Sequence, residues 1–377
     1  MANENTETFV YHESVQYPDE AALRAGADNL INGCIGDVSG KAVLLICEDP
    51  ALGWYDDKAP AIVAKQLQEK GATVKVLPVG KPQNVPVDEI QTAINSMDEV
   101  IFFSRIGDQD RFEANNNTPH STMSYARTAN MLGGAYGRLN HRAMMMLKDA
   151  VNEVMLNADH IRVTCPQGTH LEGSPANTKA EGSEVVVSRF PMGVPQPVLA
   201  SGFKGEVKLF GYLTPTGSKV YTPEFIKLDD TVSVQFNGNR ITGFTGSDDI
   251  VAKINEHYNH VAEMFGLKAF NVDSWHAGIH PQMHYDDFMG NDPSRWSNTV
   301  FTSPRFLHFH TCGETPPGEI CWMVLDPTVT IDGVALWEDG RLHPERFTGT
   351  NAVLDFAPEL AAAFNTPCMH VGLDDAN

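Results

Sequence analysis

Five of the fourteen histidines of this chain lie close together in the sequence. Neutral imidazole is the commonest protein ligand for transition metals, so a dense group of this kind indicates a metal site. Taken one at a time, each histidine could equally belong to a polar surface. The density of the group favours metal binding. The five are His276, His280, His284, His308 and His310.

The last pair, His308 and His310, lies in an alternating segment that predicts a half-buried strand over residues 305–312. Residues two apart on a strand point to the same face, with their backbones roughly 6–7 Å apart. Both imidazoles can therefore reach one ion, while Leu307 and Phe309 pack behind them. We expect these two histidines to be metal ligands.

His276 is the next expected ligand. His276 and His280 are four residues apart, which is the spacing of one helical turn. A helix is nevertheless disfavoured here, because Gly278 weakens it and Pro281 restricts the backbone of the residue before it. We therefore expect a loop here, from which only one of the two histidines reaches the ion. His280 and His284 are accordingly second-tier metal ligands, and His284 could instead belong to a lid.

The metal itself is expected to be one divalent ion per chain, with Fe(II) favoured and zinc and manganese as alternatives. A mononuclear non-haem iron site commonly combines two histidines with one carboxylate. Glu314, four residues after His310, is the nearest candidate carboxylate. The same residues also meet half of the cupin ligand pattern, but the later Gly-x-x-His segment of that pattern is missing.

Other side chains are candidates for binding or activating a substrate. His120 follows the third predicted strand in a loop, where open α/β sheets often carry functional residues. Tyr285 is a candidate catalytic residue beside the clustered histidines. Arg138 could pair with a substrate carboxylate, or it could be a surface arginine. Trp275 and Trp322 could form an apolar wall for a flat ring, or they could be core residues.

The secondary structure expected around these residues differs between the first and second parts of the chain. As far as about residue 170, strand-like and helix-like segments alternate, which predicts a parallel sheet wrapped by helices. The Gly-rich segment 133–138 does not match Gly-x-Gly-x-x-Gly and does not follow a strand, so no dinucleotide site is expected. The expected strands are 41–47, 73–79, 99–104 and 160–165, and the expected helices are 60–70 and 141–157.

Loop chemistry at residues 172–178 indicates a domain boundary, after which most segments are strand-like. We expect an α/β fold of two domains: an N-terminal parallel-sheet domain over 1–172, and a mainly β domain of α+β type over 173–377 that carries the metal site. One helix is expected in the second domain, over 248–265, with His257 and His260 on a solvated face. The expected strands are 184–188, 206–210, 231–236, 240–244, 305–312, 321–325 and 329–331.

The composition excludes several classes of partner. The chain has 27 Lys and Arg against 48 Asp and Glu, a formal charge of −21 that repels nucleic-acid phosphates and anionic lipids. Its six cysteines contain no Cys-x-x-Cys pair, which suits a reducing compartment. Neither a signal peptide nor a membrane-spanning apolar stretch is apparent. We expect a cytoplasmic protein with a small-molecule substrate.

The order of these segments resembles the thermophilic aminopeptidase family of the aminopeptidase T type. The long helix followed by residues 160–171 resembles the end of that family's first domain, and the later β-rich run to 330–333 resembles its second. The resemblance implies a homodimer with two metal ions in the second domain. A divergent branch, the 2,5-dihydroxypyridine dioxygenases, keeps the fold, holds one Fe(II) and opens a pyridine ring with oxygen.

The sequence departs from the peptidases where they require acidic ligands. Val194, Ser274 and Met323 fall near those positions, and none can bridge two ions about 3.5–4 Å apart. In the family, the region before the long helix of the first domain approaches the active site. The resemblance therefore implies that His120 can act as a general base toward an aromatic hydroxyl; the alternative is a loop histidine without a catalytic role.

Three functions follow. The favoured one is a non-haem Fe(II) ring-cleaving dioxygenase acting on a small hydroxylated aromatic or heteroaromatic compound, because the bridging acids are missing. The alternative is a metal-dependent aminopeptidase or amidohydrolase, in which one zinc ion lowers the pKa of its water to about 7. The third is a non-catalytic scaffold, which the density of histidines disfavours.

Overall fold

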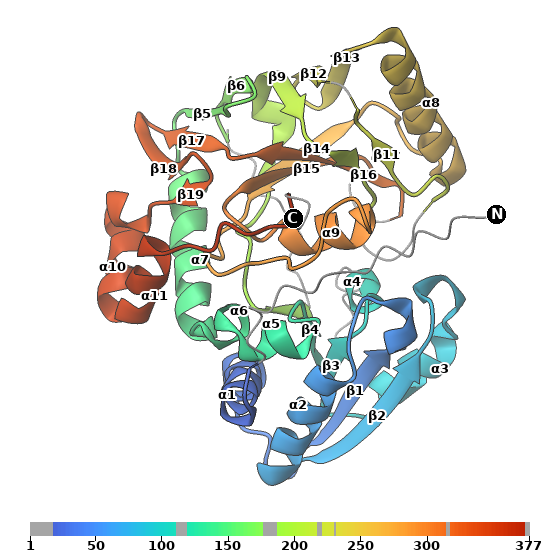
Figure 1. Ribbon diagram of the computed structural model, residues 1–377, viewed down its shortest axis with the longest axis vertical. Helices are drawn as coiled ribbons and strands as arrows, with labels where there is room; N and C mark the ends of the chain where they lie inside the picture. The colour runs from blue at the N-terminus through green and yellow to red at the C-terminus, as the bar shows by residue number, and fades with distance from the viewer. Residues whose placement is uncertain are drawn as a thin grey trace, which may run out of the picture.

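The computed structural model describes residues 18–110, 119–175, 187–216, 221–229, 231–313 and 317–373. Figure 1 shows a parallel sheet with its helices at the lower end of the molecule and antiparallel sheets at the upper end. The predicted α/β class, with a parallel sheet followed by a β-rich region, is confirmed. Among the described residues, no helix combines the length and apolar composition that crossing a bilayer requires.

The parallel sheet has the strand order β2-β1-β3-β4-β7. Successive residues of its apolar strand β1 point to opposite faces, so each face needs its own cover. Val43 and Leu45 pack with α1 and α2, whereas Leu44 and Ile46 pack with α3. The elements are α1 (Glu20–Leu30), β1 (Ala42–Glu48), α2 (Lys58–Glu69), β2 (Thr73–Val79), α3 (Val87–Ile94), β3 (Glu99–Phe103), α4 (Gly107–Asp110), β4 (His120–Ser124) and β7 (Val187–Phe190).

The expectation that residues 160–165 close the first sheet is wrong. The segment forms strand β5 (Ile161–Thr164), but β5 and β6 (His170–Gly173) pair antiparallel in the upper part of the molecule. The chain then returns to the parallel sheet, where β7 pairs with β4. The sheets therefore do not divide at residues 172 and 173, because the chain crosses between them three times, before β5, before β7 and after β7.

An eight-stranded sheet forms the outer layer of the upper part, in the order β13-β12-β9-β6-β5-β17-β18-β19. Strands β12 and β13 form a hairpin whose turn residues are Gly238 and Asn239, with Gly238 at φ 60. The remaining strands of this sheet and its neighbours are β9 (Phe203–Leu209), β10 (Tyr212–Leu213), β11 (Ile226–Lys227), β12 (Val232–Asn237), β13 (Arg240–Thr245), β17 (Thr328–Ile331), β18 (Val334–Glu338) and β19 (Arg341–Leu342).

Helices flank these sheets. The predicted helix 248–265 is confirmed as α8 (Asp248–Phe265), but His257 does not lie on a solvated face, because its ring is buried 5.2 Å from that of Tyr221. His260 is exposed, as expected. The other helices are α5 (Ala129–Gly133), α6 (Ala135–Arg138), α7 (His141–Leu156), α9 (Pro293–Val300), α10 (Thr348–Phe356) and α11 (Pro358–Asn365).

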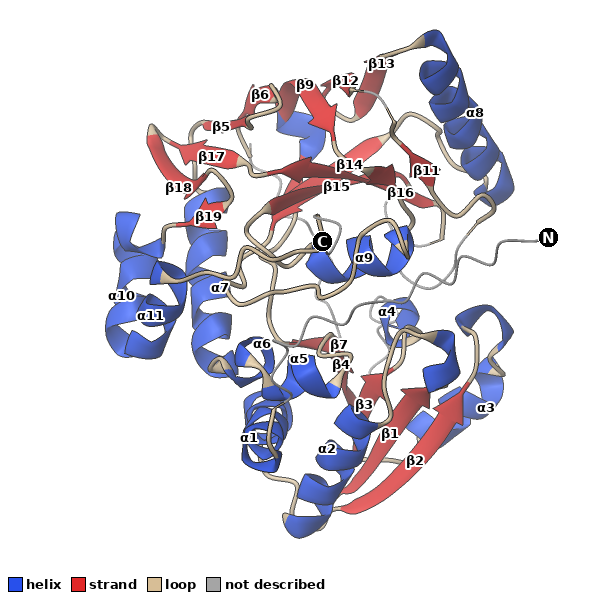
Figure 2. Cartoon of the chain, viewed as in Figure 1, coloured by secondary structure: helices blue, strands red, loops and turns tan. Residues whose placement is uncertain are grey.

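The central sheet carries most of the clustered histidines. Its order is β16-β15-β14-β8, with β8 (Val198–Leu199), β14 (Val272–Ala277), β15 (Phe306–Cys312) and β16 (Glu319–Leu325). The expected half-buried strand over 305–312 is instead buried along its whole length, because both faces of the sheet are covered. Leu307 and Phe309 face the main core, while Phe306 packs with α9, which lies between this sheet and the lower half (Figure 2).

Candidate metal centre

Three histidines converge on one face of the central sheet. His276 of β14 lies directly opposite His308 of β15, and His310 follows two residues later on the same face. The Nδ1 atom of His308 lies 3.3 Å from Nε2 of His276. The ring centroids are 5.0 Å apart for His276 and His308, 5.2 Å for His276 and His310, and 4.7 Å for His308 and His310.

This geometry fits a single metal ion. One nitrogen from each of the three rings can be chosen so that all lie within 4.8 Å of one another, and all three residues are buried. Two nitrogens 3.3 Å apart, each about 2.1 Å from a shared ion, subtend an angle of roughly 100° at that ion. The structure thus brings together the three histidines that the sequence placed first among the candidate ligands.

A buried carboxylate orients the third imidazole. Glu319, the first residue of β16, is 1% exposed, and its Oε1 accepts a hydrogen bond from Nδ1 of His310. An ionised carboxylate only accepts hydrogen bonds, so the ring proton lies on Nδ1 and the lone pair lies on Nε2. Among the described residues, none forms a hydrogen bond with the buried Nε2 of His310, as is expected of an atom prepared to bind a cation.

Glu319 was not predicted. Glu314, the carboxylate expected from its proximity to His310, lies outside the described residues. The signal for Glu319 was available in the sequence, because a carboxylate that opens an otherwise apolar strand must have a partner. Cys321 lies on the same face, opposite His310, and forms a second possible ligand group with His310 and Glu319. Its Sγ lies 2.6 Å from Oγ1 of Thr216.

The second-tier histidines lie elsewhere. His280 is fully buried, with its ring centroid 4.5 Å from that of Tyr136, and the ring of His284 lies 6.5 Å from the same tyrosine. Burial lowers the pKa of His280 to about 3. Neither residue joins a metal-ligand group in the described part of the chain. The expected loop between His276 and His280 is only partly correct, because His276 belongs to strand β14.

Tyr285 lies in an apolar cluster with Trp296 and Met323. Burial raises the pKa of its hydroxyl to about 12, and within the described part of the chain the hydroxyl has no hydrogen-bond partner. Among the described residues, no hydrogen bond or ring contact joins Tyr285 to the three converging histidines. Its surroundings are those of a core residue, which does not support the expected catalytic role.

His120 lies at the wrong edge of the parallel sheet for its expected role. It is the exposed first residue of β4 rather than part of a loop, and it pairs in register with Glu99. Its Nδ1–H donates to Oε2 of Glu99 over 2.8 Å, and its Nε2 lies 3.0 Å from Oγ of Ser188. The opposite end of β4 leads to Tyr125, which approaches the metal centre. A general base at His120 is therefore not supported.

The three expected substrate-binding residues also lie away from the histidine face. Trp275 and Trp322 alternate with the histidines and point to the other side of the central sheet, where both pack against Phe309. The indole N–H of Trp322 donates to the hydroxyl of Tyr258. Arg138 is exposed at the end of α6. Trp275 and Trp322 are therefore core residues and Arg138 is a surface arginine, which were the alternative interpretations of the sequence.

An aromatic side chain borders the metal centre instead. Phe301 follows α9 and is partly exposed, with its ring centroid 6.2 Å from that of His276 and 5.9 Å from that of His308. Tyr125, from the lower half, meets Phe301 edge to face at 5.6 Å, and its hydroxyl donates to Oδ1 of Asp108. Both halves of the molecule therefore contribute to the surroundings of the histidines.

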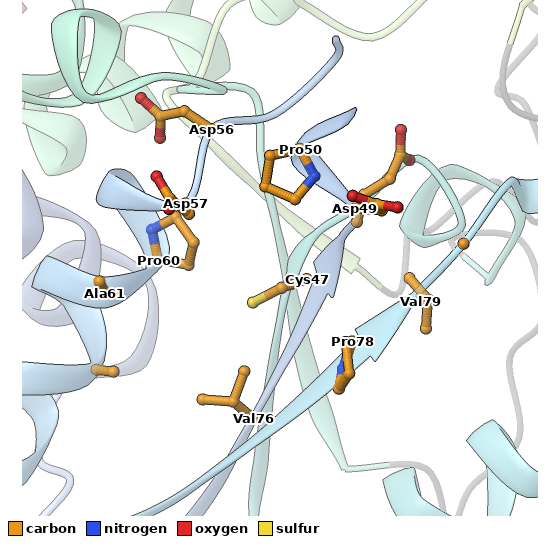
Figure 3. Close-up of a pocket in the computed structure, with 13 residues that line it drawn as sticks. Cys47, Asp49, Pro50, Asp56, Asp57, Pro60, Ala61, Val76, Pro78 and Val79 are labelled. Atoms are coloured by element: carbon orange, nitrogen blue, oxygen red, sulfur yellow. The ribbon is translucent and has the colours of Figure 1, made fainter. Parts of the chain in front are cut away.

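A separate cavity of about 520 Å³ lies at the carboxyl ends of β1 and β2 (Figure 3). Three of its four acidic residues, Glu48, Asp49 and Asp56, already have local partners. Glu48 pairs with Arg105, and Asp56 accepts from the backbone N–H groups of Ala59 and Ala129. Burial raises the pKa of the Cys47 thiol to about 11, so it is protonated at neutral pH. We therefore do not assign the metal to this cavity.

No family model and no curated protein matches this chain. Its structure is similar to 2,5-dihydroxypyridine dioxygenase from Pseudomonas putida KT2440, with a TM-score of 0.56 and 12% identity over 88% of this chain and 99% of that one. It also matches wild-type AmpT from Thermus thermophilus, with a TM-score of 0.45 and 11% identity over 86% and 99% of the two chains. The first likeness establishes a shared fold, as the sequence resemblance implied.

Proposed function

We propose that this chain is a mononuclear metal-dependent enzyme, and that it is a ring-cleaving dioxygenase of a small hydroxylated aromatic or heteroaromatic compound with Fe(II) as its metal. The observation that supports this most is the group formed by His276, His308 and His310, which offers one ion three neutral ligands. The only carboxylate described beside them, Glu319, is hydrogen-bonded to His310. A paired-ion hydrolase would need acids that are free to bridge two cations.

The residues of the chain have distinct tasks in this proposal. His276, His308 and His310 hold the ion from two hydrogen-bonded strands, which fixes their relative positions before substrate arrives. Glu319 keeps Nε2 of His310 free for the ion. When bound, Fe(II) supplies electrons and open coordination positions for oxygen chemistry. The burial of all three imidazoles limits the access of water.

The charge of the ligand group also favours a hydroxylated substrate. Three neutral imidazoles leave the charge of a divalent ion uncompensated among its direct ligands, and the Glu319 carboxylate lies one hydrogen bond away. With a divalent ion bound, such a group of residues would favour an anionic oxygen donor over a neutral one. A substrate hydroxyl would therefore bind in its anionic form, with its proton released to solvent, and the proposal requires no base at His120.

The alternative is a hydrolase with a single zinc ion, an aminopeptidase or amidohydrolase. Three histidines with an open fourth position are also a catalytic zinc arrangement, in which the bound water has a pKa of about 7. The three-histidine group allows this function. Among the described residues around this group there is no free acid that could act as the general base in peptide hydrolysis. We therefore place the hydrolase second.

Metal analysis and two assays test the proposal. Protein purified without chelators should contain close to one ion per chain, and after anaerobic loading with Fe(II) it should consume oxygen in the presence of a dihydroxypyridine or a catechol. Hydrolysis of leucine p-nitroanilide by the zinc form, without oxygen consumption by the iron form, would favour the hydrolase. Protein that binds no metal would contradict both functions. A homodimer stays a prediction that light scattering can test.

A further inference from the structure

Phe301 is more exposed than the histidines that its ring contacts. The three imidazoles are between 4% and 9% exposed, whereas Phe301 is partly exposed. Its ring contacts those of His276 and His308. In the described part of the chain no ring contact joins it to His310, whose Nε2 has no hydrogen-bond partner. Phe301 therefore borders one side of the group and leaves the side of His310 uncovered by its ring.

The ring of Phe301 is held by the lower half of the molecule. Tyr125 packs against it at an interplanar angle of 70°, and the Tyr125 hydroxyl donates to Asp108 over 2.8 Å. Tyr125 directly follows strand β4, so its backbone is fixed by the parallel sheet. An aromatic ring that only filled space beside the histidines would not need a hydrogen-bonded support from another layer.

A buried arginine fastens the helix that leads to Phe301. Arg127 is 2% exposed and donates from Nη1 to Oγ1 of Thr299 and from Nη2 to the carbonyl of Asn298. Its guanidinium lies 4.8 Å from the ring centroid of Trp54. Thr299 precedes Phe301 by two residues, so these bonds fix the end of α9 relative to the parallel sheet. The position of the phenyl ring is thus determined from two directions.

We propose that Phe301 is a specificity-determining residue, whose ring stacks against a planar ligand of the metal so that the site selects flat aromatic chelators. This inference rests on the proposed metal centre. A stacked or edge-to-face aromatic pair contributes roughly two- to tenfold in affinity beyond the burial of apolar area. A non-planar ligand with the same donor atoms gains the burial but not this contribution.

Two hydroxamates with the same chelating group provide the test. Benzohydroxamate carries a flat ring and cyclohexanecarbohydroxamate a puckered one, and acetohydroxamate has no ring. Each is titrated into the full-length protein loaded with Co(II), with the cobalt absorption spectrum as the readout. We expect the wild-type protein to prefer benzohydroxamate over the cyclohexyl compound by roughly two- to tenfold more than free Co(II) does.

The variants isolate the ring. Phe301→Leu should remove the preference while the affinity for acetohydroxamate and the cobalt content stay unchanged. Phe301→Met serves as a second variant if the leucine variant fails to fold, because methionine is flexible enough to fill the space without a planar ring. The control is Phe356→Leu, at a position 69% exposed on α10, which should keep the wild-type preference.

The outcomes separate this inference from the metal centre. If the Leu or Met variant keeps the wild-type preference, or if the wild-type protein binds both ring compounds alike, the role of Phe301 is wrong while the metal centre stands. If the protein takes up no cobalt, or if no hydroxamate changes the cobalt spectrum, the metal centre itself fails and this inference fails with it.

Discussion

The structure holds two groups of histidines, and they differ in the geometry and in the partners that binding a cation requires. The strand histidines, His276, His308 and His310, come from two neighbouring strands in register. The Tyr136 group consists of His141 from α7 with His280 and His284 from the segment after β14. The first group converges on one face of a sheet and has a buried carboxylate partner in Glu319, whereas His280 and His284 of the second lie around the Tyr136 ring.

The contacts of the Tyr136 group are those of packed core residues. Nε2 of His141 lies 3.3 Å from the Cys34 thiol, and burial lowers the pKa of His141 to about 4. Burial raises the pKa of Cys34 to about 12, so neither partner is charged at neutral pH. Burial and proximity in sequence are therefore not sufficient for a metal site. Convergence on one face and a carboxylate that fixes the tautomer distinguish the strand histidines.

The largest effect should separate the two groups directly. His308→Ala removes the residue that contacts both other strand histidines, and we expect metal affinity to fall by at least ~100-fold, since loss of an outer-shell partner alone costs about 10–100-fold. His280→Ala should leave close to one ion per chain. Metal analysis after dialysis against a weak chelator measures both. If both variants retain the same amount of metal, the two histidine groups do not differ in metal binding and the assignment is wrong.

Acid should destabilise the protein through the Tyr136 group. The folded-state pKa of His141, about 4, and that of His280, about 3, lie below the unfolded value of 6.5, so the unfolded state takes up protons first as the pH falls. Stability is therefore lost as the pH falls below about 6.5, by on the order of 2–3 kcal/mol per histidine at pH 4.5. Urea unfolding of the metal-free protein measures the loss.

The matching variant for this pH effect is His280→Leu, which has no titrating group at that position. The loss of stability between pH 7 and pH 4.5 should shrink by about 2 kcal/mol relative to the wild-type protein. A variant with the same pH dependence as the wild-type protein would mean that His280 does not titrate differently in the folded and unfolded states.

A smaller effect is expected from the carboxylate that distinguishes the strand histidines. Glu319→Gln keeps the shape of the side chain but removes the charge that holds the proton on Nδ1 of His310. We expect metal affinity to fall by about 10–100-fold with little change in the fold. Glu345→Gln is the control, since Glu345 accepts from His343 at the surface. Equal metal affinities in the two variants would refute the role of Glu319.

The smallest effect concerns the opposite face of the central sheet. Trp322→Phe removes the N–H group that donates to the Tyr258 hydroxyl, and this should cost about 1 kcal/mol in the free energy of unfolding. Metal content and substrate affinity should not change, because Trp322 points away from the histidines. A loss of substrate affinity at unchanged metal content would restore Trp322 as a substrate-binding residue.

The histidine strand could be predicted from sequence, because alternation in 305–312 places His308 and His310 on one face whatever surrounds the sheet. Its complete burial could not, since the covering of the polar face by α9 and the lower half depends on distant segments. His276 was named as a ligand candidate and lies with His308 and His310, but its strand was missed because Gly278 and Pro281 suggested a loop.

The role of Glu319 and the placement of β5 in the upper sheet were not predicted, and the reason is similar in both cases. Glu319 reaches His310 because Cys312 pairs with Glu319 across the β15–β16 hairpin, and that register cannot be read from local sequence. Proximity favoured Glu314 instead. In the same way, β5 looks like any short apolar strand, and nothing within it specifies that β17 is its neighbour rather than the parallel sheet.

X-ray absorption spectroscopy of the full-length protein loaded anaerobically with Fe(II) tests the central claim most directly. We predict about three imidazole nitrogen ligands around one iron, with the outer-shell scattering typical of histidine rings, and no second metal at about 3.5–4 Å. A metal neighbour at that distance, or an oxygen-only shell without imidazole scattering, would contradict the account.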